Sequence, residues 1–475
     1  MSFLGAQNSI ALGVQGIIAI DTGTGAPAVI TDPYWPYVSM LLHGDGTNAA
    51  QNNTFLDGST NNFTVTRNGN TTQGSFNPFV STYPYAVATN GGSAYFDGTG
   101  DYLTVPDSTA FTLGTNDFTI ECWVNFSSLA STPFFMGQGS AGFSTAWYMG
   151  VSSAGVLSSS FTSSVPSNVT ITSGASAVTI NTWYHIAIVR NGTTGRQYIN
   201  GVQNGTSSFS GFTVIDSPDV IGVGAGGAYT GNPFTGYISN FRLVNGTCLY
   251  PSGTTFTPPT APLTAVTNTA LLLGMSNGAI YDNAELNNLE TVVGAQVSTS
   301  VYKYGTGSMS FNGTTDYLNT SPANQNSFAF GSGDFTIEMW VNPTVLGTSN
   351  KFLYDGRLSV DGAFPSIYVN ASSLVLYLAN GATQITGGAI STATWTHIAI
   401  CRSGTSTKLF INGTQSGSTY SDSTVYLNNP LRPVIGSNGP IGAYWNGYID
   451  DLRVTKGIAR YTANFTPPTA AFPNS

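Results

Sequence analysis

The sequence predicts an all-β protein made of two tandem antiparallel β-sandwiches of the jelly-roll type, behind a short N-terminal arm. Three observations predict this fold. Apolar and polar side chains alternate in many short segments, so that Phe118, Ile120 and Val124 would share one face of a strand. Asn-Gly dipeptides between β-forming runs indicate tight hairpins. Long phrases of the first half return in the second half, with almost no helical periodicity between them.

The repeated phrases cover most of each half. They are NDFTIECWVNF at 116–126 and GDFTIEMWVNP at 333–343, NTWYHIAIVRNG at 181–192 and ATWTHIAICRSG at 393–404, and GYISNFRL at 236–243 and GYIDDLRV at 447–454. A unit of this length is far longer than the roughly 20–50 residues of a solenoid repeat. The phrases therefore indicate two tandem domains.

The opening phrases set the predicted boundaries. VSMLLHGDGTN at 38–48 corresponds to NTALLLGMSNG at 268–278. We therefore place the first domain at residues 38–262, a short linker at 263–267 and the second domain at 268–475. Residues 1–37 have no counterpart and form the arm. The short, proline-flanked linker predicts a stiff pair of domains.

Each unit carries one hairpin signal of the strongest kind. Asn200-Gly201 lies within YINGVQNG, and Asn412-Gly413 lies within KLFINGTQSG. Both dipeptides suit a type I′ turn, which needs two residues with positive φ.

The composition excludes several classes of protein. Charged residues make up 7% of the chain and the net charge is -9, whereas charged residues make up roughly 25% of ordinary soluble domains. Without a basic stripe, binding to nucleic acid or to an anionic membrane surface is not expected. No apolar run reaches the ~18 residues of a membrane-spanning helix. A surface of Ser, Thr, Asn and Gly is typical of extracellular adhesins and virus-particle proteins.

The cysteines do not form a repeated framework. Cys122, Cys248 and Cys401 correspond to Met339, Ala459 and Val189 in the other repeat. We interpret them as small buried hydrophobes. The fold would then need no disulfides and could assemble in a reducing cytoplasm.

The order of the phrases resembles a known family. LLHGDG, FDGTGDYL, DFTIECWV, WYHIAIVR, INGVQNG and GYIDDLRV follow one another as in the laminin-G-like jelly roll of the concanavalin A-like lectin/glucanase superfamily. The ending IDDLRVTKGIARYTANFTPPTAAFP, with the opening YWPYVSMLLHGDGTN, is similar to the version in structural proteins of tailed bacteriophages. The resemblance implies a surface-exposed virion protein, assembled in the host cytoplasm, as a fibre, a tail-tip component or a capsid decoration. It also implies a homo-oligomer.

The arm is expected to bind other virion proteins. Its apolar residues could add a strand to a partner or fill a groove on it. These residues are Ile10, Leu12, Ile17, Ile18 and Ile20. The DPYWPY stretch at 32–37 could instead pin the arm to its own first domain or to a neighbouring subunit.

Catalysis is not expected, although the superfamily includes glucanases. Their active strand resembles E-x-D-x-E, whereas the matching strands here read DFTIE, with Thr119 or Thr336 as the middle residue. The remaining acids are four residues apart, or about 13 Å along a strand. Glycoside hydrolysis needs carboxyls about 5–9.5 Å apart. We expect Glu121 and Glu338 to accept hydrogen bonds from backbone or Trp N–H groups. His185 and His397, which occupy one repeat position, should be satisfied sandwich histidines.

The family resemblance also implies a structural calcium ion, bound by acids of the opening and closing phrases. The first domain carries Asp45 and Asp97, but Ser239-Asn240 in its closing phrase. The second carries Asp450 and Asp451, but Met275-Ser276 in its opening. Neither domain keeps the whole set, so calcium is left open for each.

Saccharide binding would use exposed aromatic faces. The repeated pairs Trp123 with Trp340, and Trp183 with Trp395, are most simply core. The unrepeated Trp147-Tyr148 and Tyr444-Trp445 lie in Gly-rich stretches predicted as loops. These four residues are the candidate glycan contacts, unless they pack against the sandwich edge. The predicted role is non-enzymatic adhesion to host or environmental polysaccharide. The alternatives are a purely structural decoration and a polysaccharide-degrading enzyme.

Overall fold

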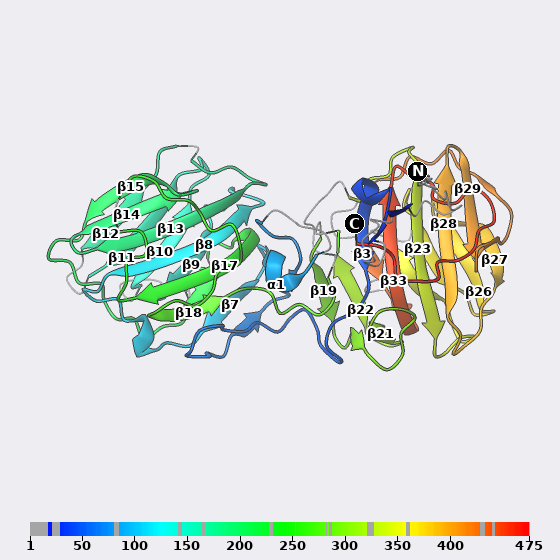
Figure 1. Cartoon of the computed structure of the whole chain (residues 1–475), viewed down its shortest axis with the longest axis horizontal. Coiled ribbons are helices and arrows are strands. Elements are labelled where there is room, and N and C mark those ends of the chain that lie inside the picture. Colours follow the sequence, from blue (N-terminus) through cyan, green and yellow to red (C-terminus); the bar gives the residue numbers. More distant parts are fainter. Residues whose placement is uncertain are drawn as a thin grey trace, which may run out of the picture.

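The computed structural model of the chain describes residues 18–20, 29–79, 85–140, 145–163, 167–175, 177–227, 231–251, 253–281, 283–284, 287–320, 327–357, 362–427, 433–438 and 442–474. Within them, four large antiparallel sheets pair into two sandwiches that lie side by side along the long axis (Figure 1). β1 (Ile18–Ile20) and β2 (Val29–Thr31) form a separate small sheet. The predicted all-β fold is confirmed.

The first sandwich joins a sheet in the order β12-β11-β10-β9-β16-β7-β4 to a sheet in the order β15-β14-β13-β8-β17-β6-β5, with β18 beside β17. Its strands are β4 (Thr66–Asn68), β5 (Thr72–Gly74), β6 (Ser93–Asp97), β7 (Tyr102–Val105), β8 (Phe118–Phe126), β9 (Phe134–Gln138), β10 (Trp147–Val151), β11 (Leu157–Thr162), β12 (Asn168–Thr172), β13 (Trp183–Asn191), β14 (Thr194–Ile199), β15 (Val202–Ser208), β16 (Ile221–Val223), β17 (Thr235–Asn245) and β18 (Thr269–Leu273). Short helical turns are η1 (Trp35–Tyr37), α1 (Val87–Asn90) and η2 (Thr109–Phe111).

The second sandwich repeats this plan, with sheets in the orders β19-β22-β32-β24-β25-β26-β27 and β20-β21-β33-β23-β28-β29-β30. Its strands are β19 (Leu289–Val292), β20 (Gln296–Ser298), β21 (Ser308–Asn312), β22 (Tyr317–Thr320), β23 (Phe335–Pro343), β24 (Lys351–Asp355), β25 (Ser366–Val369), β26 (Leu374–Ala379), β27 (Ala382–Ala389), β28 (Thr396–Ser403), β29 (Ser406–Ile411), β30 (Thr414–Gln415), β31 (Tyr420–Ser421), β32 (Val434–Ile435) and β33 (Asn446–Lys456).

The two opening strands are exchanged between the sandwiches. β3 (Val38–Leu42) pairs with β33 of the second sandwich, with Leu41 opposite Arg453. β18, which opens the second repeat, pairs with β17 of the first sandwich, with Leu272 opposite Arg242. Figure 1 shows β3 beside β33 and β18 beside β17, in opposite lobes. The predicted boundaries at 38 and 268 are therefore corrected, because each opening strand completes the other half's sandwich.

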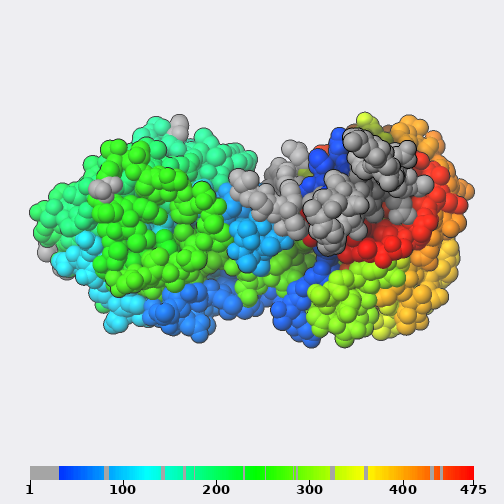
Figure 2. Space-filling view, in the orientation of Figure 1, coloured from blue at the N-terminus to red at the C-terminus, as the bar shows by residue number. Residues whose placement is uncertain are grey.

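The exchange makes the chain cross between the sandwiches twice. Residues 43–55 run from β3 to Phe55 in the first core, and the segment between β18 and β19 returns. The space-filling view shows a waist between two lobes, where blue and green segments meet (Figure 2). The first sandwich is thus one continuous stretch of chain inserted into the second.

The Asn-Gly hairpins are confirmed. Asn200 and Gly201 have φ angles of 49° and 73°, and Asn412 and Gly413 have 47° and 75°. Two successive positive φ angles define the type I′ turn that the dipeptides predict.

The DPYWPY stretch lies on the second sandwich and not on the first. Asp32 accepts hydrogen bonds from Arg453 Nη1 at 2.9 Å and from Arg460 Nη2 at 2.7 Å. Trp35 packs on a small cluster that includes Leu41 and Phe472. The expectation that this stretch pins the arm to the first domain is wrong, because β3 carries it across.

Two of the five apolar arm residues, Ile18 and Ile20, lie among the described residues. Ile10, Leu12 and Ile17 lie outside the described residues. Ile18 and Ile20 belong to β1, where their backbones pair with Thr31 and Val29. Among the helices of the described stretches, none has the length and apolar character needed to cross a membrane.

Candidate functional site

The acid of each DFTIE strand lies in a buried ionic cluster. Glu338 accepts hydrogen bonds from Arg453 Nε at 3.0 Å and Nη2 at 2.7 Å, and from the Tyr461 hydroxyl at 2.9 Å. His397 Nε2 lies 3.4 Å from the same carboxylate. The Glu338 side chain has no exposed surface, so no substrate can reach it.

The first sandwich holds the same cluster. Glu121 accepts from Arg242 Nε at 2.9 Å and Nη2 at 2.6 Å, and from the Tyr250 hydroxyl at 2.7 Å. His185 Nε2 lies 3.1 Å from Glu121. The expected backbone or Trp N–H donors are wrong for both glutamates. Each histidine has a carboxylate partner on the neighbouring strand, which only the strand register reveals.

The charges of these clusters favour the ionised form of both glutamates. Burial alone would raise the pKa of Glu338, but Arg453 and His397 outweigh it and hold the pKa well below its ordinary value. For Glu121, His185 and Arg242 likewise outweigh burial, and the pKa is lowered. Both carboxylates remain ionised structural acceptors.

The repeated closing phrase covers these clusters. Tyr461 stacks on Phe465 with ring centroids 3.5 Å apart, and Tyr250 stacks on Phe256 at 3.7 Å. The Phe465 N–H donates to the Gly413 carbonyl, and the Phe256 N–H donates to the Gly201 carbonyl, each at 2.8 Å. The stretch after the last long strand of each repeat, here called the tail (residues 246–262 and 457–474), thus crosses the outer face of the larger sheet and is hydrogen-bonded to the Asn-Gly turn on its way. This contact explains why both phrases recur together.

The first acid of each DFTIE strand has a separate structural role. Asp117 accepts the Gly192 N–H at 2.6 Å, and Asp334 accepts the Gly404 N–H at 2.7 Å. These aspartates hold the turn that follows the neighbouring strand.

The predicted glycan contacts do not form a surface. Trp147 lies in β10 and Trp445 just before β33, and both are 0% exposed within the two cores. The prediction that they contact sugar is wrong, and they pack inside the sandwiches instead. Tyr148 is half-buried against Phe134, and Tyr444 is half-buried with its ring 6.4 Å from that of Tyr317.

The repeated tryptophans lie on the outer faces of the larger sheets. Trp123 and Trp183 are half-buried. Trp340 is buried beneath Lys303, whose Nζ lies 4.3 Å from the ring centroid. Trp123 lies against Phe79, and Trp183 lies against Phe76. Repetition therefore marks residues on the outer faces of these sheets as well as residues of the inner cores.

The strand exchange collects three of the predicted calcium ligands in the second sandwich. Asp45 Oδ1 accepts the Thr306 N–H at 2.6 Å, and Asp450 Oδ2 accepts the Lys303 N–H at 2.7 Å. Asp451 Oδ1 lies 2.5 Å from His43 Nδ1. Asp97 stays in the first sandwich, where it accepts the Thr99 N–H at 2.6 Å.

These carboxylates hold main-chain amides and one histidine. The described residues contain no group of three or more His, Cys, Asp or Glu arranged to hold a metal ion. Burial, together with the charge of Asp451, raises the pKa of Asp450 to about 7. Calcium at these residues stays a prediction.

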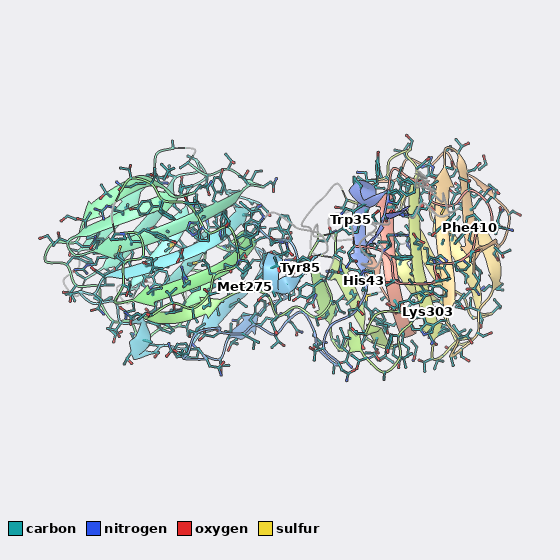
Figure 3. All side chains as sticks on the ribbon, in the orientation of Figure 1. Trp35, His43, Tyr85, Met275, Lys303 and Phe410 are labelled. Carbon is teal, nitrogen blue, oxygen red and sulfur yellow. The ribbon has the colours of Figure 1, made fainter. Side chains whose placement is uncertain are left out.

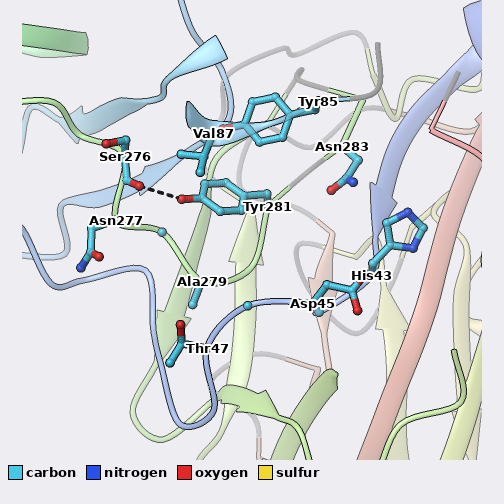
Figure 4. A pocket seen from close by; sticks show the side chains of 13 residues that line it. His43, Asp45, Thr47, Tyr85, Val87, Ser276, Asn277, Ala279, Tyr281 and Asn283 are labelled. Carbon is cyan, nitrogen blue, oxygen red and sulfur yellow. Dashed lines mark hydrogen bonds between the residues drawn. The ribbon is translucent and has the colours of Figure 1, made fainter. Parts of the chain in front are cut away.

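A hollow of about 470 Å³ opens where the chain crosses between the sandwiches (Figure 4). Its walls are residues 43–47 of the outgoing crossing, residues 276–279, Tyr281 and Asn283 of the returning one, and Tyr85 and Val87 of the first sandwich. Figure 3 places Tyr85 and Met275 at the junction, and His43 on the side of the second sandwich that faces the first. Sequence reasoning missed this hollow because it depends on the exchange.

Two tyrosine rings form one wall of the hollow. The ring centroids of Tyr85 and Tyr281 are 5.4 Å apart. The Tyr85 hydroxyl donates to the Gly91 carbonyl at 2.6 Å, and the Tyr281 hydroxyl donates to the Ser276 carbonyl at 3.0 Å. Both hydroxyls are therefore anchored, and the rings are held in place.

A buried asparagine fixes the two crossings to each other. Asn52 Nδ2 donates to the carbonyls of Ile280 and Leu289 at 2.7 and 2.9 Å. Asn52 Oδ1 accepts the N–H groups of Ala279 and Ile280 at 2.7 and 2.8 Å. Gln73 Oε1 also accepts the Asn277 N–H at 3.0 Å. The returning segment is thus held in place by the first one.

A second hollow, of about 440 Å³, lies on the first sandwich. It is lined by Thr60, Asn61, Ala110, Asn245 and residues 265–270. Among the described residues, this lining holds no aromatic ring, so it offers no flat apolar face.

A sequence profile of the concanavalin A-like lectin/glucanases superfamily matches residues 97–249 and 312–458. No curated protein matches the chain.

Several solved structures are similar to parts of this chain at low identity. Domain 4 of AbnA, a GH43 extracellular arabinanase from Geobacillus stearothermophilus solved with arabinotriose, is 19% identical over 34% of this chain and 77% of that one, with a TM-score of 0.28. The LG1-3 region of the laminin alpha2 chain is 12% identical over 80% of this chain and 64% of that one, with a TM-score of 0.37. The CBM40 of the Ruminococcus gnavus IT-sialidase, bound to alpha2,3 sialyllactose, is 14% identical over 32% and 89%, with a TM-score of 0.26.

Proposed function

Because this chain belongs to the concanavalin A-like lectin/glucanases superfamily, with one matching region in each half of its sequence, we propose that it is a non-enzymatic adhesion protein. It binds saccharides at the surface of a tailed-bacteriophage particle. The observation that carries the non-enzymatic role is the burial of Glu121 and Glu338 in ionic clusters beneath the tails.

The scarcity of charged side chains supports display on the surface of a particle. With 7% charged residues and a net charge of -9, the chain has little means of binding nucleic acid or membranes nonspecifically. The resemblance of the opening and closing phrases to phage structural proteins supports the virion setting. In this proposal the N-terminal arm binds other virion proteins, the protein is a homo-oligomer, and it assembles in the host cytoplasm. Many weak sites on one particle would add up to firm attachment.

One experiment separates binding from catalysis. The purified chain is applied to a glycan array and, in parallel, incubated with the polysaccharides of the bound class while reducing ends are measured. We expect binding without release of reducing sugar. Release of reducing ends at a rate that depends on the protein would contradict the proposal.

A second candidate is a purely structural decoration. The double crossing between the sandwiches favours it, since two lobes fixed to each other suit a rigid spacer as well as a binding module. Absence of binding on the array, together with gold-labelled antibody found on purified particles, would favour this candidate over adhesion.

A further inference from the structure

We propose that the hollow at the crossing binds the end of a neutral saccharide chain. The inference rests on the proposed adhesion function and assigns it a site. The hollow is composite, because its walls come from both crossings and from the first sandwich. Its volume of about 470 Å³ falls within the roughly 300–1,000 Å³ of small-ligand sites.

The tyrosine wall supplies the apolar contact. Each hydroxyl of Tyr85 and Tyr281 donates to a main-chain carbonyl, so the two rings cannot swing out of the wall freely. A ring face matches the apolar C–H face of a sugar, and rings fixed in advance cost little entropy on binding.

Unengaged polar groups supply the hydrogen bonds. Among the described residues, no hydrogen bond engages the side chains of Thr47 or Asn283, and both line the hollow. Asp45 uses Oδ1 for the N–H groups of Thr306 and Gly307, while Oδ2 accepts none of the hydrogen bonds within the described stretches. An amide, a hydroxyl and a carboxylate together suit a ligand rich in hydroxyl groups.

The charge of the lining selects against anionic sugars. Among the described residues, the acidic and basic side chains of the lining are Asp45 and His43, with neither Lys nor Arg. A sialic acid, uronic acid or sulfate group would face this carboxylate, which is unfavourable. His43 offers it no free cation, because its Nδ1 already pairs with Asp451 and its Nε2 with Asn474. A neutral sugar meets no such cost. The lining therefore favours a neutral chain end over an acidic one.

The test uses the full-length chain and two surface variants, Thr47→Val and Asn283→Ala. Both replace polar groups that no described residue engages, so the melting temperature should not change. Thr60→Val is the matched control, because Thr60 is an exposed threonine of the second hollow. The probes are immobilised trisaccharides that end in glucose, galactose, mannose or rhamnose, and the same chains capped with sialic acid.

We expect the wild type to bind neutral trisaccharides more tightly than capped ones, with each hollow variant about tenfold weaker and the control unchanged. Neutral binding that neither hollow variant weakens would overturn this site while leaving the adhesion function intact. Stronger binding to sialylated chains would overturn the inferred ligand class. Absence of binding to every probe would count against the adhesion function and the site together.

Discussion

Glu338 shows how single residues hold the outer face of the second sandwich. It receives three hydrogen bonds from Arg453 and Tyr461 with no exposure to solvent, and Arg453 in turn pairs with Asp32. The first sandwich has no aspartate in the place of Asp32, and Arg242 Nη1 donates to the Thr264 carbonyl instead. The extra partner means that residues 32–37 stabilise the second sandwich through charge.

Replacing Glu338 by Gln should destabilise the second sandwich strongly. The substitution leaves the buried Arg453 without its main counter-charge, which costs about 3–5 kcal/mol for a broken buried pair. Urea unfolding followed by tyrosine and tryptophan fluorescence measures the loss. Glu121→Gln is the matched variant in the first sandwich. A loss below about 1 kcal/mol in both would show that the clusters are not the structural element described.

The free energy of unfolding should depend on pH through four groups, namely Asp450, His43, Glu121 and Glu338. The raised pKa of Asp450, about 7, favours the protonated form in the folded state, so its contribution to unfolding free energy falls as pH rises from about 4 to 7. Burial lowers the pKa of His43, but Asp451 outweighs it and raises the pKa. The stabilisation from His43 is therefore present below about pH 6.5 and lost above it. Glu121 and Glu338, with lowered pKa values, lose their contribution as pH falls below about 4.3.

Melting curves in chelator should therefore show maximal stability between about pH 4 and 6, with a decline toward pH 8 that Asp450→Asn reduces. A curve that rises steadily to pH 8 would contradict this assignment. The same curves with added Ca²⁺ check the calcium prediction. A bound ion raises the melting temperature at pH 8, and Asp451→Asn removes that rise.

At the scale of elements, each Asn-Gly turn is also the docking point of a tail. A Cβ on Gly413 would lie 2.0 Å from the Phe465 carbonyl oxygen. A Cβ on Gly404, which has a similar positive φ of 58°, would meet nothing within 4 Å. Substitutions at the two glycines therefore distinguish the cost of backbone strain from the cost of losing the tail contact.

Gly404→Ala should cost about 1–2 kcal/mol from the left-handed backbone alone. Gly413→Ala should cost at least about 2 kcal/mol more, because the tail must leave the turn. Thermal unfolding of the two variants side by side measures the difference. Equal losses would mean that the tail does not depend on this turn.

The sequence predicted the strands and turns but not which faces they bury. Alternation in β8 correctly places Phe118 and Ile120 in the core. Thr119 and Glu121 on the opposite face are also buried, since the tail that follows β17 covers them. The alternation of apolar and polar residues along a strand cannot show that a segment distant in the sequence covers its polar face. Trp147 was assigned to a loop for a similar reason, because its Gly-rich surroundings hid a strand.

At the scale of the whole molecule, the sequence predicted two sandwiches but not their connection. β3 and β18 carry the same apolar pattern and face equivalent partners, Arg453 and Arg242. Either sheet could accept either strand, so local pattern cannot decide between a simple tandem and an exchange. For the same reason, the hollow at the crossing could not be predicted from the sequence.

The exchange is the central claim, because it fixes the lobes together and builds the hollow. Two full-length variants test it most directly, Met40→Cys/Val454→Cys and Met40→Cys/Leu243→Cys. Met40 lies opposite Val454 in the second sandwich, whereas Leu243 of the first sandwich faces Leu271. Directly paired strand residues are close enough for a disulfide.

Mild oxidation followed by peptide mass spectrometry identifies the bridges and separates them from the native Cys122, Cys248 and Cys401. We predict a disulfide within single chains of the Met40→Cys/Val454→Cys variant and none in the other. An intrachain disulfide only in Met40→Cys/Leu243→Cys would show that each repeat keeps its own opening strand, and would contradict both the exchange and the site built on it.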